Sequence, residues 1–241
     1  MVKNGCSDYE SDSEIPESNA YGDYAETFNV NRTVNQYHSS YAPLSISDLF
    51  KVGRILGWLI AKAEISAVTS LLKNCKCRTL LDIPCGAGKL HHTLENSGFS
   101  IIGADRSLQM LRESRKSGAT EVALICSDIR AIPLRDEAID VVICLRFLHR
   151  IPFHLHRDTI EEISRVASSH TIIYFARRRF LSSIIARIER ATGLGDRGMI
   201  HHLSKADILC EINRNGWSFV KGRNVLPLLS VGYVVLTEKV K

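Results

Sequence analysis

One short apolar run is followed by an acidic residue and then by two glycines. This order is typical of sites that bind small molecules. The run 79–83 predicts a buried parallel strand that carries Asp82. Gly86 and Gly88 then form a turn, and the amphipathic run 89–97 predicts a helix. Glycines let a ligand approach the main chain closely, and the first N–H groups of a helix are free to donate hydrogen bonds. This order therefore predicts a binding site of nucleotide size.

The spacing of the glycines excludes two common nucleotide-binding motifs. A dinucleotide-binding turn, G-x-G-x-x-G, needs a third glycine where this chain has His91. A P-loop, G-x-x-x-x-G-K-[ST], needs a glycine in place of Ile83 and a hydroxyl residue in place of Leu90. The sequence therefore predicts neither of these sites at the turn.

The pattern that remains resembles motif I of the class I S-adenosylmethionine (SAM) methyltransferases, L-D-x-G-C-G-x-G. The matching residues are Leu81, Asp82, Cys85, Gly86 and Gly88. Pro84 departs from the pattern, because the family usually has its first glycine there and proline has no N–H to donate. A second segment resembles P-F-x-D-x-x-F-D-x-V of the small-molecule (type 11-like) subgroup. Its matching residues are Leu134, Asp136, Ile139 and Asp140, of which Asp140 is expected to be structural.

The resemblance also implies a cofactor, SAM, and the side chains that hold it. The second predicted strand, 100–104, is followed by Asp105, which is expected to accept hydrogen bonds from the ribose hydroxyls. After the third strand, Asp128 is expected to accept from the adenine amine and Ile129 to cover the adenine ring. The implied cofactor-binding set is Asp82, Cys85, Gly86, Gly88, Asp105, Arg106, Asp128, Ile129 and Leu145.

One histidine is the candidate catalytic base. The strand 141–145 leads into the segment 146–152, which in the family forms the mouth of the site. His149 lies in that segment, and an imidazole changes its charge near neutral pH. The other interpretation is that His149 only orients the loop. The chain lacks the Asn-Pro-Pro-Tyr and Asp-Pro-Pro-Tyr motifs that resemble those of nucleic-acid base methylation, which argues against that class.

The composition is that of an ordinary globular protein. Of the 241 residues 45% are hydrophobic and 24% are charged, and no run of about 18 apolar residues predicts a membrane-spanning helix. The first residues lack the apolar stretch of a secretory signal, so a cytoplasmic location is expected. The seven scattered cysteines are expected to be reduced thiols. Cys75 and Cys77 lack the spacing of a zinc site, and no metal is expected.

Charge divides the chain into an acidic head and a basic body. Residues 1–26 hold seven acids and one lysine; because the whole chain carries +5, the −6 of this head leaves +11 for the rest. The head has few apolar groups and is expected to be a disordered tail. Residues 27–77 are expected to form a helical cap with a helix at about 48–73, and residues 78–241 the SAM-binding domain.

A basic amphipathic stretch interrupts this domain. Apolar residues within 177–190 share one helical face, while the arginines lie elsewhere. This pattern is typical of a lid over a substrate or of a helix on a membrane surface. We expect a lid insertion over 177–203, with peripheral membrane contact through 177–190 as the alternative.

Strands alternating with helices predict an α/β fold. We expect a three-layer α/β/α Rossmann-like sheet of seven mostly parallel strands that ends in an antiparallel hairpin over 217–226 and 231–238. The resemblance implies methyl transfer from SAM to an O, N or C nucleophile of a small molecule, with a lipophilic acceptor allowed by the amphipathic stretch. Two alternatives stay open: an RNA or protein methyltransferase that uses the basic surface, and a SAM-fold binding or scaffold module without catalysis.

Overall fold

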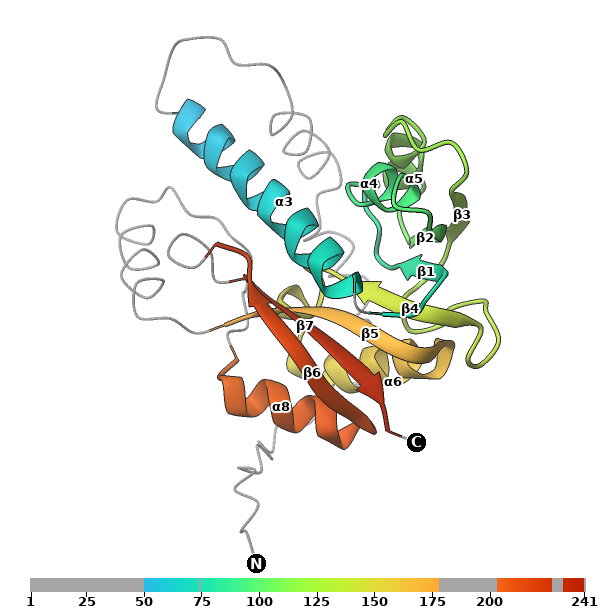
Figure 1. Cartoon of the computed structure of the whole chain (residues 1–241), viewed down its shortest axis with the longest axis vertical. Coiled ribbons are helices and arrows are strands. Elements are labelled where there is room, and N and C mark those ends of the chain that lie inside the picture. Colours follow the sequence, from blue (N-terminus) through green and yellow to red (C-terminus); the bar gives the residue numbers. More distant parts are fainter. Residues whose placement is uncertain (1–49, 74, 178–202, 227–231, 241) are drawn as a thin grey trace, which may run out of the picture.

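The computed structural model describes residues 50–73, 75–177, 203–226 and 232–240 (Figure 1). The expected acidic tail, most of the expected lid and the possible membrane contact lie outside these residues. The proposed division into tail, cap and domain therefore stays a prediction. In the described part of the chain, no helix is both long and apolar enough to span a membrane.

Seven strands form one mixed sheet in the order β3-β2-β1-β4-β5-β7-β6. They are β1 (Thr79–Asp82), β2 (Ser100–Asp105), β3 (Ala123–Cys126), β4 (Ile139–Cys144), β5 (Ala167–Ala176), β6 (Trp217–Asn224) and β7 (Gly232–Lys239). The first five pair in parallel, whereas β7 runs antiparallel to both β5 and β6. The predicted fold is confirmed. The strand order reverses between β1 and β4, and ligands of such sheets bind beyond the carboxyl ends of the strands at this point.

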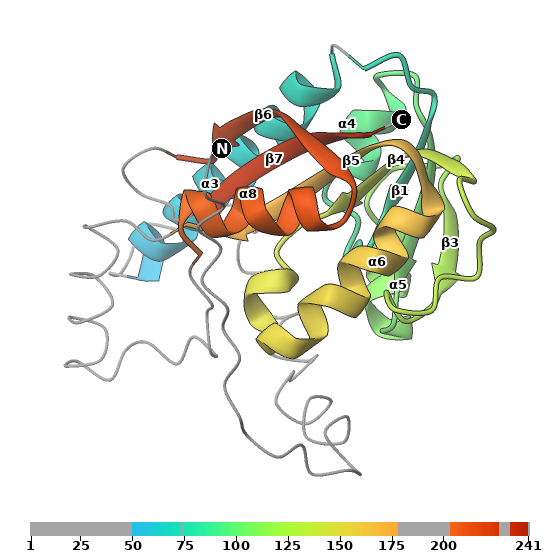
Figure 2. The same cartoon turned by 90° about the horizontal axis from the view of Figure 1, so that it is seen from below.

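Helices cover both faces of the sheet. α3 (Phe50–Leu72) and α4 (His91–Glu95) pack on one face, and α5 (Leu108–Ser114) lies beside α4 (Figure 1). α6 (His156–Val166) and α8 (Lys205–Arg214) cover the other face (Figure 2). Short 3-10 turns at Leu148–Arg150 and Phe153–Leu155 connect β4 to α6.

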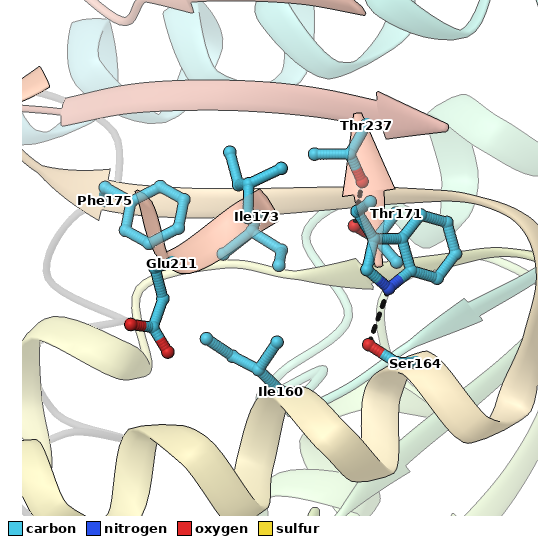
Figure 3. Close-up of a pocket in the computed structure, with 9 residues that line it drawn as sticks. Ile160, Ser164, Thr171, Ile173, Phe175, Glu211 and Thr237 are labelled. Carbon is cyan, nitrogen blue, oxygen red and sulfur yellow. Dashed lines mark hydrogen bonds between the residues drawn. The ribbon is translucent and has the colours of Figure 1, made fainter. Parts of the chain in front are cut away.

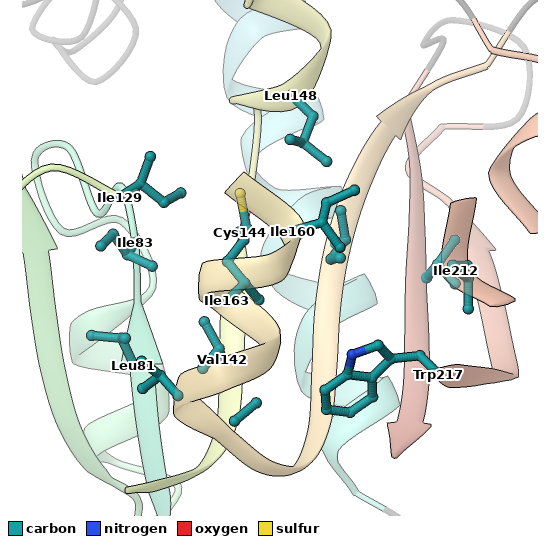
Figure 4. Packing of buried hydrophobic residues seen from close by; sticks show 14 of the residues in the cluster. Leu81, Ile83, Ile129, Val142, Cys144, Leu148, Ile160, Ile163, Ile212 and Trp217 are labelled. Atoms are coloured by element: carbon teal, nitrogen blue, oxygen red, sulfur yellow. The ribbon is translucent and has the colours of Figure 1, made fainter. Parts of the chain in front are cut away.

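Alternation along the central strands supplies a core on each face, because successive strand side chains point to opposite sides. Leu81 and Val142 join the α6 and α8 side, where Ile163 and Trp217 pack near them (Figure 4). Leu80, Val141 and Ile143 join the other side, against Val68 and Leu71 of α3. The buried apolar run that predicted β1 therefore reflects burial on both faces.

Side chains fix several element ends as the sequence predicts. Ser107 caps α5 by accepting a hydrogen bond from the N–H of Met110. Asp140 accepts from the N–H groups of Arg78 and Thr79 at 2.8 and 2.9 Å, which ties β4 to the start of β1. These donors lower the pKa of Asp140. Its expected structural role is confirmed.

Two expectations need correction. The helix predicted over 89–97 is only His91–Glu95, because hydrogen-bonded turns occupy the residues before it and Gly98, with φ +84°, follows its end. A one-turn helix offers little as an N-terminal binding site, so the glycine turn and its side chains must supply the contacts. The expectation of reduced thiols is wrong at Cys210, which is disulfide-bonded.

Candidate functional site

Asp82 ends β1 and is buried, with 3% of its surface exposed. The imidazole of His91 is fully buried beside it, with Nε2 3.3 Å from Asp82 Oδ2. The other ring nitrogen, Nδ1, lies 3.1 Å from the hydroxyl of Ser114 in α5. A buried carboxylate needs polar neighbours to offset its lost hydration. His91 provides one, and it connects the end of β1 to α5.

The same imidazole explains why two nearby positions are occupied by glycine. A Cβ atom on Gly103 in β2 would lie 2.6 Å from His91 Cε1, and one on Gly88 would lie 2.8 Å from His91 Nδ1. Gly88 also has a φ of +71°, which favours glycine. A dinucleotide-binding turn uses its third glycine for close packing of helix on sheet. Here an imidazole occupies that position and glycines surround it.

Asp105 ends β2 and holds the glycine turn in place. Its Oδ2 accepts a hydrogen bond from the N–H of Gly86 at 2.9 Å, and its Oδ1 accepts from the N–H of Ser107 at 2.8 Å. Burial raises the pKa of Asp105, the two N–H donors lower it, and the charge of Asp82 raises it. An ionised carboxylate has about four acceptor positions. The N–H groups of Gly86 and Ser107 use two of these positions on Asp105. The predicted contact with ribose hydroxyls needs only the remaining ones.

The main chain of the turn is open at Gly86. This residue has a φ of +55°, and apart from its chain neighbours no atom of the described residues lies within 4 Å of where its Cβ would be. Cys85 is buried and donates its N–H to the carbonyl of Ala104 at 2.8 Å. Burial raises the pKa of the Cys85 thiol, which disfavours the reactive thiolate form near neutral pH. Pro84 follows Ile83 through a cis peptide bond.

The two residues expected at the adenine ring have other contacts. The Asp128 carboxylate accepts hydrogen bonds from the Arg130 guanidinium at 3.2 and 3.1 Å, and from the Arg130 main chain at 2.9 Å. Ile129 is 5% exposed and packs in the core with Ile83 (Figure 4). A contact of Asp128 with adenine would therefore share its carboxylate with Arg130.

Beyond β4 the chain brings basic residues to a buried acid. Arg146 has a φ of +55°, uncommon for a residue with a side chain, and its Nε donates to Oε1 of Glu64. Glu64 lies in α3 and is 3% exposed. His149, the candidate base, is also buried, and its ring lies 5.1 Å from that of Tyr174 in β5. Arg150 Nε lies 3.5 Å from His149 Nε2.

Lys89 belongs electrostatically to this basic group. It follows Gly88 directly and is partly buried. Burial lowers its pKa to about 8; the positive charges of Arg146 and Arg150 also lower it, and the negative charge of Glu64 raises it. We refer to Lys89, Arg146 and Arg150 as the basic cluster.

The structure thus brings some predicted site residues together and separates others. Five of them lie around the ends of β1 and β2: Asp82, Cys85, Gly86, Gly88 and Asp105. Arg106 is exposed beside them, Leu145 is half-buried after β4, and His149 lies toward β5. Sequence reasoning missed Lys89, His91, Glu64 and Arg146. A signal existed for Glu64, since it is the only acid in α3 and lies at helical spacing from buried Ala61 and Val68.

A small cavity lies on the other face of the sheet, under α6 and α8 (Figure 3). Its volume is about 10 Å³. It is lined by Ile160, Ser164, Thr171, Ile173, Phe175, Glu211, Ile212, Trp217 and Thr237. Trp217 Nε1 donates to Ser164 Oγ at 2.7 Å, and the hydroxyls of Thr171 and Thr237 are 2.6 Å apart. A space close to that of a single water molecule holds no cofactor, so this cavity is a feature of the core.

Residues 81–175 match the family model described as "Methyltransferase domain". The chain is 29% identical over 82 residues to the malonyl-[acyl-carrier protein] O-methyltransferase of Xylella fastidiosa, covering 31% of this chain and 28% of that protein. It is 24% identical over 149 residues to the chloroplastic magnesium protoporphyrin IX methyltransferase of Arabidopsis thaliana, covering 59% and 47%. The chain therefore spans less than two thirds of the length of these relatives.

A solved structure resembles the fold over nearly the whole chain. It is the magnesium protoporphyrin IX methyltransferase of Synechocystis with bound S-adenosylhomocysteine (SAH), with a TM-score of 0.71 and 16% identity. The match covers 90% of this chain and 99% of that one. At this identity the likeness shows the Rossmann-like fold.

Proposed function

Because residues 81–175 form a SAM-dependent methyltransferase domain, we propose that the chain moves the methyl group of SAM to an O, N or C atom of a small molecule. The observation that carries the proposal is the pair of buried carboxylates, Asp82 and Asp105, beside the open glycine turn. SAM, when bound, supplies a methyl group on a positively charged sulfur, which is open to attack by a nucleophile. Two carboxylates suit a ligand that carries positive charge and ribose hydroxyls.

Each residue of the turn has a part in this proposal. Asp105 holds the N–H of Gly86 and offers its other acceptor positions to the ribose. Gly86 lets the ligand approach the main chain, since it has no side chain and open space beside it. His91 lies beside Asp82, and Ser114 hydrogen-bonds to the other nitrogen of its ring. Contacts of Asp128, Ile129, Arg106 and Leu145 with the cofactor remain part of the proposal.

The protein's own contribution to the reaction is to position the reactants. Aligning the acceptor with the methyl group removes much of the entropic cost of bringing two molecules together. The residues after β4 lie at the same edge of the sheet as the glycine turn and are the proposed acceptor side. His149 would act there as a base for an acceptor that loses a proton. The two relatives are methyltransferases that act on different molecules, so they support a methyl acceptor in general but not a particular one.

Calorimetric titration of SAM into the purified protein tests the proposal. We expect binding by the parent protein and at least a tenfold loss in Asp105→Ala, because the turn loses its anchor and the ribose its acceptor. Asp136→Ala is the matched control, since its carboxylate is exposed and pairs with Arg165 far from the turn in sequence. Thermal unfolding of each variant separates loss of the site from loss of the fold. A parent protein that binds no SAM overturns the proposal.

A further inference from the structure

The two halves of α3 differ in what covers them. In the second half, Val68, Leu71 and Leu72 are buried against strands of the sheet. In the first half, Trp58 and Leu59 are 41% and 40% exposed. Figure 1 shows the first turns of α3, in blue, extending past the strands, while its last turns lie over them. This helix therefore presents large apolar side chains to solvent in the half that extends past the sheet.

The first half of α3 is apolar on more than one side. Trp58 and Leu59 are consecutive residues, so their side chains leave the helix about 100° apart. The residues 50–60 are rich in large apolar side chains throughout. Single exposed apolar residues are ordinary, but an adjacent exposed pair within an apolar run marks an interaction surface. A helix that is apolar all round is normally covered by protein or by lipid.

The charged residues on this side of α3 are all basic. Lys51 and Arg54 precede Trp58 by seven and four residues. Lys62 follows Trp58 by four residues, so these positions share one side of the helix. The exposed Lys62 ammonium lies 4.9 Å from the centre of the Trp58 ring. Glu64, the only acid in α3, is buried in an ion pair, so its charge faces the protein. A negatively charged partner therefore suits this side of the helix.

Lipid fits this combination of side chains better than a second copy of the chain does. An indole ring has an apolar body and a polar N–H, which suits the level of the lipid headgroups. Lysine and arginine lay their apolar stems along such a surface and extend their charges to the phosphates. Basic helices that carry Trp and Leu lie in the membrane interface for these reasons. A second copy of the same face would bring basic residues against basic residues, which disfavours a symmetric pair.

We propose that Trp58, Leu59 and Lys62, which we call the α3 patch, bind the surface of a membrane that contains anionic lipids. Trp58 and Leu59 enter the headgroup region, and the basic residues of α3 pair with lipid phosphates. The contact is peripheral, since no helix in the described part of the chain could span a membrane. It differs from the contact that the sequence predicted through 177–190. It goes beyond the proposed function and does not depend on it.

The chain has two tryptophans, and their different burial makes this inference measurable. Trp217 is 3% exposed and donates to Ser164, so Trp217→Phe leaves the exposed Trp58 as the only tryptophan. The full chain with this substitution is titrated with vesicles of phosphatidylcholine and with vesicles of phosphatidylcholine and phosphatidylserine in equal parts. We expect a blue shift of the emission, and quenching by lipids brominated in their acyl chains, with the anionic vesicles only. Co-sedimentation of the parent protein repeats the comparison without the substitution.

Variants locate the lipid contact. Trp58→Ser is expected to weaken co-sedimentation with anionic vesicles about tenfold, because the apolar area of the ring is no longer buried in lipid. Lys62→Gln should weaken it by a smaller factor, and added salt should do the same by screening the charge. Val240→Ser is the matched apolar control, since this valine is 60% exposed near the end of the chain. Lys116→Gln is the matched charge control, since this lysine is exposed and pairs with Glu113.

The inference is overturned if the parent protein does not associate with anionic vesicles, or associates equally with both kinds. Equal weakening in Trp58→Ser and Val240→Ser would overturn it as well. A dimer that depends on Trp58, seen by analytical ultracentrifugation without vesicles, would assign the α3 patch to a second copy instead. Unfolding curves and a SAM titration of Trp58→Ser show that a loss of vesicle binding is neither a loss of fold nor a failure of the proposed function.

Discussion

The carboxyl edge of the sheet has an acidic side and a basic side, and they are held in different ways. Asp105 is fixed by two main-chain N–H groups, and Asp82 lies beside a buried imidazole from the next helix. Arg146 is fixed by Glu64, which lies 82 residues earlier in the chain. The acidic side is therefore a local construction around a turn, and the basic side depends on how α3 docks on the sheet.

This difference matches the proposed division of labour. A cofactor shared by many enzymes can be held by a local motif. An acceptor particular to this protein would be recognised by residues from distant segments, because those can change without disturbing the motif.

Breaking the basic side should cost the most stability. Arg146→Gln leaves the Glu64 carboxylate buried without its partner, and we expect a loss of about 3 kcal/mol in the free energy of unfolding. Chemical denaturation measures it. The double variant with Glu64→Gln should recover most of the loss, since no charge is then buried. Parent-like stability of Arg146→Gln would show that Glu64 does not need this arginine.

A substitution that disturbs the packing on the acidic side should lower the free energy of unfolding by somewhat less. A Cβ on Gly103 would meet His91 Cε1 at 2.6 Å, so Gly103→Ala should lose about 2 kcal/mol of stability by overpacking. In a His91→Ala background the same change should cost much less, because only the movable end of Leu124 then lies close. An equal cost in both backgrounds, measured by denaturant unfolding, would contradict the packing of the imidazole described above.

The negative charge of Asp82 should affect the binding of the cofactor, SAM, more than the binding of the product, SAH. SAM carries a positive sulfur and SAH does not, so Asp82→Asn should weaken SAM binding about fivefold more than SAH binding. That ratio corresponds to about 1 kcal/mol. Calorimetry with both ligands measures it, and a general loss of packing would reduce both affinities alike. Equal losses would exclude a charge effect of Asp82.

The sequence predicted the fold and the acidic side because both depend on local patterns. The segments predicted as strands correspond to the seven strands of the sheet, and Asp82, Gly86 and Gly88 lie at the turn that their spacing indicates. The predicted length of α4 was wrong, because a run of helix-compatible residues does not reveal that its first residues form hydrogen-bonded turns. The pairing of Asp128 with Arg130 was missed although the two residues are neighbours in sequence.

The basic side could not be predicted in the same way. Lys89 directly follows the motif, but its partial burial and its charged neighbours depend on the packing of β1 against β4. The Glu64 and Arg146 pair joins an N-terminal helix to a loop far along the chain, and no spacing encodes such a contact. Only the single acid on the apolar face of α3 pointed to a buried charge there.

The most direct test is to titrate SAM into Asp105→Ala and Arg150→Gln side by side. We predict that Asp105→Ala loses SAM binding and that Arg150→Gln keeps it. SAM binding that depends on Arg150 rather than on Asp105 would contradict the placement of the cofactor on the acidic side of the site.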